Sequence, residues 1–565
     1  MLKNRALLIP VCLFVLAFLF RLVGIGWGLK NEFHNQSYHP DEIVNFQVAN
    51  QIDLASGQVA PHFYNYGTAY FFVYNVASKM VAGYGGGPTG DPNLDWDYQR
   101  RCELAGRIIS AAAGAGVVVV IWLVCRRLTT LLGSAFGAGL ACFAPGLVIH
   151  SRFATVDVFG VFFIALSAMF ALRLLPPQLG SLAEADESKA SDLKSALLSG
   201  LFAGIAGGTK YTEILVLLVL ITVVIGLRRK GWAVSLMAAI GAAIVGFFVT
   251  TPGALLEWSK FTHDLQYELQ HSASGHGLIF IGTTSGFLYH LGNLMVGVGV
   301  LAVVASLFSL AWAIWRKRIW AIALTIFLVV YYIVIGRAEV TFLRYIFPLI
   351  IPMAVGFGYG VGCAFREGGW RGRVCIVAGV FALVGNPFFD FGGIIGAARY
   401  THFMISTDPR DEALIYMRQQ GKGSVAGLVK DPWFWSVPFV PDAGVTRNLL
   451  PLPYAELTAT TDPKVVRFLP DGSLEGRKDW DVRLLTDYHP DFVVYSSFES
   501  GDEERLSNSS RLDAGTQALI DDYKTFYSRL DADYELQAVF GGLMPEVHDL
   551  MYIHPTVYVW KKKAN

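Results

Sequence analysis

Long apolar runs separated by short charged segments dominate the first 390 residues. A helix of about 20 apolar residues crosses the hydrocarbon core of a bilayer, so such runs predict membrane spans. The runs lie at 6–27, 104–125, 131–148, 156–175, 195–209, 211–227, 232–250, 286–314, 319–336, 342–364 and 374–389. The run at 195–209 is short, as in a tilted, broken or partly re-entrant span. The pattern predicts a polytopic α-helical membrane protein of about 11 transmembrane helices.

Basic residues mark every second loop between these runs. The basic positions are Lys3, Arg5, Arg126, Arg127, Lys189, Lys194, Arg228, Arg229, Lys230, Arg316, Lys317, Arg318, Arg366, Arg371 and Arg373. Since cytoplasmic loops are enriched in Lys and Arg, the N-terminus is predicted in the cytoplasm and the C-terminal tail outside. The remaining loops, at 30–103, 149–155 and 251–285, are then outer loops. Arg21 follows the first run without a small-x-small site, so we expect this segment to be retained as a span.

The first outer loop carries its own helical signals. Residues 47–57 have helical spacing and end at Gly57, and residues 63–85 are amphipathic and rich in Tyr and Phe. Both segments are expected to lie in the membrane interface.

The composition changes at about residue 390, where charge rises and apolar runs shorten. Helices are predicted at 408–423 and 514–530. Short strands are predicted at 424–429, 491–497, 534–540 and 556–562. We therefore expect two domains: a membrane module over 1–389 with the large first outer loop (30–103), and a soluble outer α/β domain over 390–565.

Composition agrees with this division. The 565 residues are 53% hydrophobic and 16% charged, with a mean hydropathy of +0.45, whereas a soluble domain carries roughly 25% charge. The formal net charge is zero, so nothing indicates a nucleic-acid partner. None of the six cysteines lies after residue 375, so we expect the C-terminal domain to fold without a disulfide framework.

The tetrapeptide His39-Pro40-Asp41-Glu42 is the most informative candidate site. It places two carboxylates where the first span has just reached the outer surface. Pro-Asp is also ordinary turn chemistry, so a solvated turn is the competing interpretation. A carboxylate at the bilayer rim suits a general base that takes a proton from an incoming hydroxyl or amine.

A second outer acid, Asp157, stands at the start of the apolar run 156–175. An acid that enters a hydrophobic helix is costly and indicates function by default. The alternative is a helix N-terminus, where an acid is favoured by the dipole. His150 and Arg152 lie close by in sequence and suit tuning of its charge or binding of an anion.

Three further cations stand at outer boundaries of spans: Lys210, Arg337 and Arg344. Snorkelling to the interface is the simple interpretation of such residues. Arginine is also well suited to hold a phosphodiester by a bidentate fork. A cationic group beside outer acids favours a reaction whose leaving group is a phosphate.

The outer loop 251–285 holds several acids and histidines, but their spacing matches no strict metal motif. His263 and His271 with Asp264 are the candidates for a metal site. A polar lid helix is the favoured interpretation, and metal dependence stays open.

Taken together, these motifs resemble the GT-C superfamily of polyprenyl-phosphate-dependent glycosyltransferases, with the protein O-mannosyltransferase and aminoarabinose-transferase branches as the nearest likeness. The matching segments, in chain order, are RLVGIGWG, YHPDE, PHFYNYGTAYFF, RCELAGRIISAAAGAG, HSRFATVDVF, GLFAGIAGGTKYT, RAEVTFLRYIFPLIIP and STDPRDEALIYMRQQ followed by DFVVYSS. The Trp-Trp-Asp-Tyr-Gly motif of the oligosaccharyltransferase branch is absent.

The resemblance implies a GT-C-type fold and roles for single residues. Asp41 inherits the main catalytic role, with Glu42 and Asp157 in support. The implied donor-phosphate ligands are Lys210, Arg344, Arg337 and Arg152. The implied donor and acceptor pocket is formed by His39, Tyr64, Tyr66, Tyr345 and His263.

The resemblance also implies an activity. A sugar linked to a polyprenyl phosphate would enter from the outer leaflet, and an acceptor deprotonated by Asp41 would attack the anomeric carbon with inversion. The partners would be this donor, the bilayer and a glycan, lipid or protein acceptor. No cofactor is required by this mechanism. A bacterial inner or plasma membrane is the expected location, with the C-terminal domain outside.

Three alternatives stay open on sequence alone. A flippase for lipid-linked saccharides would use the same charges without bond chemistry, although no internal repeat or matched halves support it. A non-catalytic receptor or assembly factor would leave Asp41, Asp157 and Lys210 unexplained. A transferase that uses a lipid diphosphate and a divalent metal is permitted by the paired acids Asp41 and Glu42.

Overall fold

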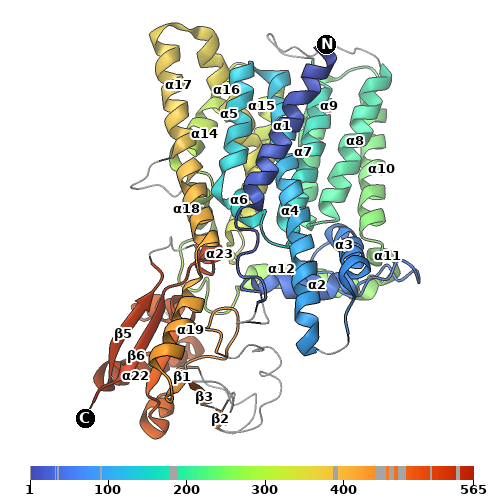
Figure 1. Ribbon diagram of the computed structural model, residues 1–565. Helices are drawn as coiled ribbons and strands as arrows, with labels where there is room; N and C mark the ends of the chain where they lie inside the picture. The colour runs from blue at the N-terminus through green and yellow to red at the C-terminus, as the bar shows by residue number, and fades with distance from the viewer. Residues whose placement is uncertain are drawn as a thin grey trace.

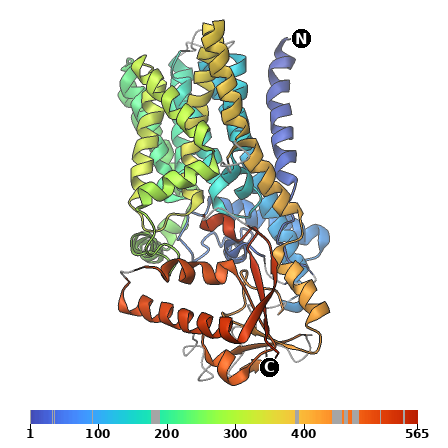
Figure 2. The ribbon, with the colours of Figure 1, turned by 90° about the vertical axis from the view of Figure 1, so that its left-hand side faces the viewer.

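A helical bundle with a sheet-containing domain at one end makes up the computed structural model (Figure 1). The structure describes residues 2–31, 34, 37–89, 92–176, 189–385, 392–439, 454–456, 463–468, 479–509, 512–542 and 547–564. The N-terminus lies at the end of the bundle opposite the sheet (Figures 1 and 2).

The bundle is mostly helical, and a helix lies within each of the eleven predicted runs. Its helices are α1 (Leu2–Leu22), α4 (Pro92–Leu128), α5 (Leu131–Phe143), α6 (Pro145–His150), α7 (Val156–Arg173), α8 (Lys189–Gly207), η1 (Tyr211–Val216), α9 (Leu217–Leu227), α10 (Trp232–Thr250), α13 (Gly286–Gly297), α14 (Val300–Trp315), α15 (Ile319–Gly336), η2 (Leu343–Ile346), α16 (Phe347–Glu367), α17 (Gly369–Val384) and α18 (Gly393–Ile405). The number of spans is smaller by a strict length test. Among the described residues five helical segments are long and apolar enough to cross a membrane, or six if the bent pair α13–α14 counts as one.

Burial separates central from peripheral helices. In the segment Leu343–Glu367, 89% of the most apolar window is buried inside the protein, against 17% for Trp232–Thr250. Helix α16 therefore forms the centre of the bundle. The apolar side chains of α10 face outward, as expected where lipid replaces protein as the neighbour.

The span predicted at 286–314 is not straight, because the chain bends by 109° between α13 and α14. Gly299 at the break has φ +119°, a conformation that side-chain-bearing residues rarely adopt. The freed carbonyl of Val298 accepts a hydrogen bond from the backbone N–H of Gly393 at 3.1 Å. The break is therefore stabilised by α18, a helix that the sequence pattern did not predict.

Short helices cover the end of the bundle that faces the sheet domain (Figure 1): α2 (Pro40–Asn50), α3 (Ala69–Gly85), α11 (Gly253–Leu256) and α12 (Trp258–Ser274). The helix predicted over 47–57 is displaced, because Pro40 at the first turn and the cap residue His39 start α2 seven residues earlier. The chain then turns, with an isolated bridge between Asp53 and Gln58. The polar helix expected in the loop 251–285 is α12.

The C-terminal region contains a six-stranded sheet of order β2-β3-β1-β4-β6-β5. The strands are β1 (Val425–Leu428), β2 (Tyr454–Glu456), β3 (Lys464–Phe468), β4 (Phe492–Ser496), β5 (Tyr534–Phe540) and β6 (Val557–Lys562). Strand β1 pairs in parallel with β3 and β4, and the other pairs are antiparallel. All four predicted strands are confirmed, and β2 and β3 are additional.

Helices cover both faces of this sheet. Helix α19 (Pro409–Gln420) packs Leu414 and Met417 against β1 and β6, and α22 (Ala514–Asp533) packs Phe526 and Leu530 against the other face. The described residues of this domain also form three short helices: η3 (Leu484–Tyr488), α21 (Ser497–Leu506) and α23 (His548–Met551). The helices predicted at 408–423 and 514–530 are confirmed as α19 and α22.

Candidate active site

Asp41 lies at the start of α2 and shares one arginine with a carboxylate from the far end of the chain. The Arg344 guanidinium is 3.5 Å from Asp41 through Nη2 and 3.5 Å from Asp549 through Nη1. Asp549 also accepts a hydrogen bond from the backbone N–H of Arg344 at 3.1 Å. The Asp41 side chain is 33% exposed, whereas that of Asp549 is fully buried. Asp41 is therefore the carboxylate of this pair that an incoming molecule can reach.

Asp157 and Lys210 form a second ion pair next to the first. Lys210 Nζ lies 2.9 Å from Asp157 Oδ1, at the start of α7, and 4.3 Å from the centre of the Tyr345 ring. Tyr345 follows Arg344 in η2, so Lys210 contacts the same short segment that carries Arg344. We call Asp41, Asp157, Lys210, Arg344 and Asp549 the charged cluster.

Glu42 turns away from this cluster and is completely buried. Its two oxygens accept hydrogen bonds from Arg107 Nε and Nη2, both at 2.7 Å, and from the backbone N–H of Ala154 at 2.7 Å. The hydroxyl of Ser37 donates to it as well. Burial raises the pKa of Glu42, but the Arg107 guanidinium outweighs burial and holds the pKa below its usual value. Glu42 thus fixes the loop 30–103 to α4 and to the 150–155 segment.

Aromatic and imidazole groups surround Asp41. The His39 ring nitrogen Nε2 lies 3.2 Å from the hydroxyl of Tyr552, and burial lowers the pKa of His39, so its ring is neutral. Burial, with the nearby Asp41 carboxylate, raises the pKa of Tyr66, which keeps this hydroxyl protonated. His150 Nε2 is 3.9 Å from Asp549 Oδ2. These groups supply hydrogen-bond donors and acceptors without adding net charge.

The other predicted ligands lie elsewhere. Arg152 is buried and donates to the carbonyls of Phe20 and Arg21 and to the hydroxyl of Thr401, so it joins α1 to α18. Arg337 is exposed at the end of α15. Neither contacts the charged cluster through an interaction among the described residues, and we do not assign them to phosphate binding.

Tyr64 and His263 belong to the contact between the first outer loop and α12. The Tyr64 hydroxyl donates to Glu257 at 2.5 Å, and its backbone N–H donates to Asp264 at 3.0 Å. His263 is 76% exposed and touches Asp264 at 3.2 Å. These residues hold the loop in place and do not line the charged cluster.

Asp549 and Tyr552 are the site residues that the sequence did not reveal. They come from α23 and the turn after it, more than 200 residues beyond Arg344, in a short segment of mixed polar and apolar residues. Burial raises the pKa of Asp549 to about 6 although Arg344 opposes this shift. A single acid and a tyrosine before the last strand give no sequence pattern that distinguishes residues of a buried site from those of a surface turn.

The described residues contain no group of three or more His, Cys, Asp or Glu side chains arranged to hold a metal ion. His271 contacts His276 at 2.9 Å, and His263 contacts Asp264, so the candidates for a metal site lie in separate pairs.

Residues 11–256 match the model of one protein family, dolichyl-phosphate-mannose-protein mannosyltransferase. The matched part includes Asp41, Glu42, Asp157 and Lys210 and ends before Arg344. This match covers less than half of the chain and agrees with the GT-C glycosyltransferase resemblance of the ordered motifs. No curated protein matches the chain.

Solved structures of membrane glycosyltransferases are similar to this chain at low identity. ArnT from Cupriavidus metallidurans in the apo state is 14% identical, with a TM-score of 0.49 over 99% of this chain and 98% of ArnT. ArnT bound to undecaprenyl phosphate is 16% identical, with a TM-score of 0.46 over 71% and 69% of the two chains. The archaeal oligosaccharyltransferase AglB from Archaeoglobus fulgidus, in complex with an inhibitory peptide and a dolichol-phosphate, is 11% identical, with a TM-score of 0.46 over 73% of this chain and 58% of AglB.

Proposed function

From the family match over residues 11–256, we propose that this protein is an integral-membrane glycosyltransferase that moves a sugar from a polyprenyl-phosphate donor to an acceptor, with inversion at the anomeric carbon. The observation that carries the proposal is the charged cluster. It combines one partly exposed carboxylate, Asp41, with two cations, Lys210 and Arg344, at the end of a bundle of apolar helices.

In this mechanism Asp41 acts as the general base. The acceptor hydroxyl or amine gives its proton to the Asp41 carboxylate as its oxygen or nitrogen bonds to the anomeric carbon. The bond between that carbon and the phosphate oxygen breaks, and the electron pair leaves with the lipid phosphate. A phosphate leaving group needs no proton, so a single base is sufficient.

Lys210 and Arg344 stabilise the charge that develops on the leaving phosphate. Cations already held in place cost no reorganisation at the moment of reaction, which is the main way that such groups lower a barrier. Asp157 holds Lys210 at 2.9 Å, and Asp549 holds Arg344. We assign a positioning role to Asp157 and Asp549, and to Glu42, which fixes the loop that carries Asp41.

The remaining features fit one orientation in the membrane. We propose that residues 1–389 form the membrane module and that residues 390–565 form an outer domain, with the N-terminus in the cytoplasm. The N-terminus and the sheet domain lie at opposite ends of the bundle (Figure 2), as this orientation requires. The charged cluster lies at the end near the sheet domain, since Asp549 of α23 contributes to it. A bacterial inner or plasma membrane is the location we propose.

Turnover of defined donors tests this function. Purified full-length protein in nanodiscs would be incubated with polyprenyl-phosphate mannose, glucose, aminoarabinose and galactosamine, and with one polyprenyl-diphosphate sugar, with and without a chelator. We expect release of polyprenyl phosphate from at least one monophosphate donor, unchanged by the chelator. Release from the diphosphate donor alone, abolished by the chelator, would instead support a metal-dependent transferase. Binding or transbilayer movement of donors without release would support a flippase.

A further inference from the structure

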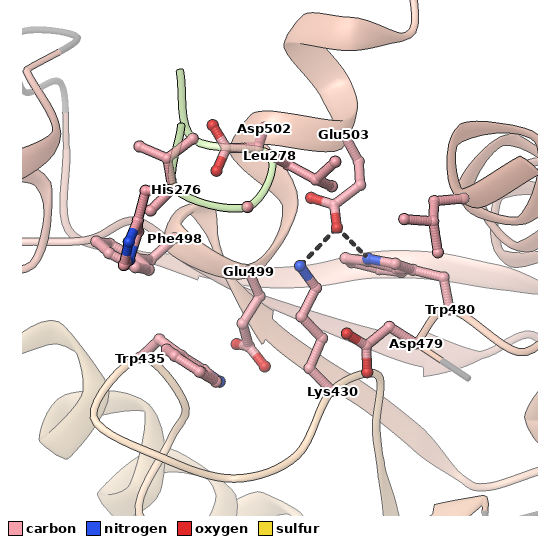
Figure 3. Close-up of a pocket in the computed structure, with 13 residues that line it drawn as sticks. His276, Leu278, Lys430, Trp435, Asp479, Trp480, Phe498, Glu499, Asp502 and Glu503 are labelled. Carbon is pink, nitrogen blue, oxygen red and sulfur yellow. Dashed lines mark hydrogen bonds and ion pairs between the residues drawn. The ribbon is translucent and has the colours of Figure 1, made fainter. Parts of the chain in front are cut away.

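A hollow lies between the sheet domain and the segment that joins α12 to α13 (Figure 3). Its volume is about 360 Å³, within the range of roughly 300–1,000 Å³ that small-molecule sites occupy. Residues His276 to Ile279 form one wall, and side chains of the sheet domain, among them Trp435, Trp480 and Glu503, form the others. We call this hollow the aromatic pocket.

Two buried carboxylates in the aromatic pocket each have an oxygen without a hydrogen-bond partner among the described residues. These atoms are Glu499 Oε1 and Glu503 Oε2, on side chains that are 1% and 3% exposed. The other oxygen of Glu499 accepts from the backbone N–H of Ser496 at 2.7 Å. The other oxygen of Glu503 accepts from Lys430 at 2.5 Å and from the Trp480 indole at 3.2 Å. A buried acceptor left unpaired is costly, which points to a donor-bearing ligand in the pocket.

Aromatic faces stand beside these acceptors. The rings of Trp435 and Phe498 are nearly parallel, 8° apart in plane and 6.4 Å between centres. Figure 3 shows Trp435 on one side of the pocket and Trp480 on the other, with Glu499 and Lys430 between them. A flat apolar face next to unpaired acceptors matches a sugar ring, which presents C–H groups on its face and hydroxyl donors around its edge.

Two routes of side-chain contacts connect the aromatic pocket to the surroundings of Asp41. The Phe498 ring lies 4.8 Å from His548 and 6.4 Å from Tyr552, measured between ring centres. Tyr552 contacts His39, two residues before Asp41. On the other side, the pocket residue His276 packs against Phe342, over which the Arg344 guanidinium lies at 4.0 Å.

We propose that the aromatic pocket binds a saccharide unit of the acceptor and so presents a neighbouring hydroxyl to Asp41. This assignment of the occupant rests on the proposed glycosyl transfer, whereas saccharide binding itself does not. Glu499 and Glu503 accept hydrogen bonds from sugar hydroxyls, and Trp435 covers the apolar face of the ring. The acceptor class is then a glycan or glycolipid.

Saccharide binding is measured on the full-length protein in nanodiscs by saturation-transfer NMR and by titration. The probes are methyl α-mannopyranoside, cellobiose and N,N′-diacetylchitobiose, with spermidine as a cationic comparison. Trp435→Ala and Glu503→Gln should each raise the Kd of the bound saccharide about tenfold or more. Glu504→Gln, at the exposed neighbouring position of the same helix, should leave binding unchanged.

Release of polyprenyl phosphate to water in the absence of acceptor separates the two proposals. Both pocket variants should keep the wild-type rate of this reaction, because they leave the charged cluster intact. Failure of all three saccharides to bind, binding of spermidine in their place, or equal saccharide binding by all variants would overturn the pocket assignment. None of these results would alter the proposed transfer activity, which depends on Asp41.

Discussion

In the proposed mechanism the donor phosphate competes with Asp549 for Arg344, and this competition predicts an unusual dependence of donor affinity on pH. Arg344 lies 3.5 Å from both Asp41 and Asp549. At this distance two unit charges attract by roughly 5 kcal/mol for an effective dielectric constant of about 20. A donor phosphate must take over part of this attraction when it binds to Arg344.

The direction follows from the pKa of Asp549, which burial raises to about 6. Above this pH Asp549 is ionised and competes for Arg344. Below it Asp549 is neutral, and Arg344 is available to the phosphate. Donor affinity should therefore rise as the pH falls from 7.5 to 5. A difference of only 1.4 kcal/mol, well under the full attraction, corresponds to about a tenfold change in Kd.

The assay is titration of wild-type protein and Asp549→Asn with a short-chain polyprenyl-phosphate sugar, a phosphodiester whose charge is constant over this range, at several pH values and without acceptor. Asp549→Asn should bind about tenfold more tightly than wild type at pH 7.5 and should show little change with pH. Asp521→Asn, on the exposed face of α22, should behave as wild type. Weaker binding by Asp549→Asn at every pH would show that Asp549 only holds Arg344 in place, and would refute the competition.

Three further predictions concern the structure around the site. Lys210→Met should raise the donor KM about tenfold or more, with partial recovery in Lys210→Arg, because the mechanism makes Lys210 a charge partner of the phosphate. Steady-state kinetics measure the KM of each variant. An unchanged KM would remove Lys210 from the donor site. Glu42→Gln should lower the free energy of unfolding by about 3–5 kcal/mol, because it leaves Arg107 buried without its counter-charge. Thermal unfolding in nanodiscs measures this loss. The control Asp97→Asn, in a surface pair with Arg100, should lower the free energy of unfolding by less than about 1 kcal/mol. Equal effects of the two substitutions would contradict the assigned role of Glu42. Gly299→Ala should lower the free energy of unfolding by about 1–3 kcal/mol, because Gly299 has a φ of +119°. Gly292→Ala, inside α13 with open space at its Cβ position, should leave the stability unchanged. Equal unfolding midpoints of the two variants would mean that the α13–α14 break tolerates a side chain.

The hydrophobic pattern is sufficient to locate the helices of the bundle other than α18, and four strands of the sheet. Each of these elements is a local run whose periodicity shows in the sequence, such as β4 (Phe492–Ser496), in which every residue is buried. The break at Gly299 and the early start of α2 at Pro40 depend on single residues, and a window average hides them. Strand β2 has only three residues and pairs with β3, and β3 pairs with the more distant β1, which a local pattern does not show.

The candidate site was predicted in part. Asp41, Asp157, Lys210 and Arg344 stand out in the sequence as charges at predicted membrane boundaries, and the structure brings all four together. The sequence could not separate Asp41 from Glu42, because adjacent residues on a helix point to different surroundings and only packing shows which carboxylate is buried against Arg107. For the same reason Arg152 looked like a phosphate ligand, although its guanidinium donates to backbone carbonyls of α1.

The central claim is that Asp41 is the base of a glycosyl transfer, and its most direct test is the single-turnover release of polyprenyl phosphate by Asp41→Asn. A variant that lacks the general base should react about 10²–10⁴-fold more slowly than wild type while donor binding is retained, because Lys210 and Arg344 remain in place. Asp97→Asn serves as the control at an exposed acid outside the cluster and should react at the wild-type rate. Release by Asp41→Asn at a rate close to that of wild type would contradict the account.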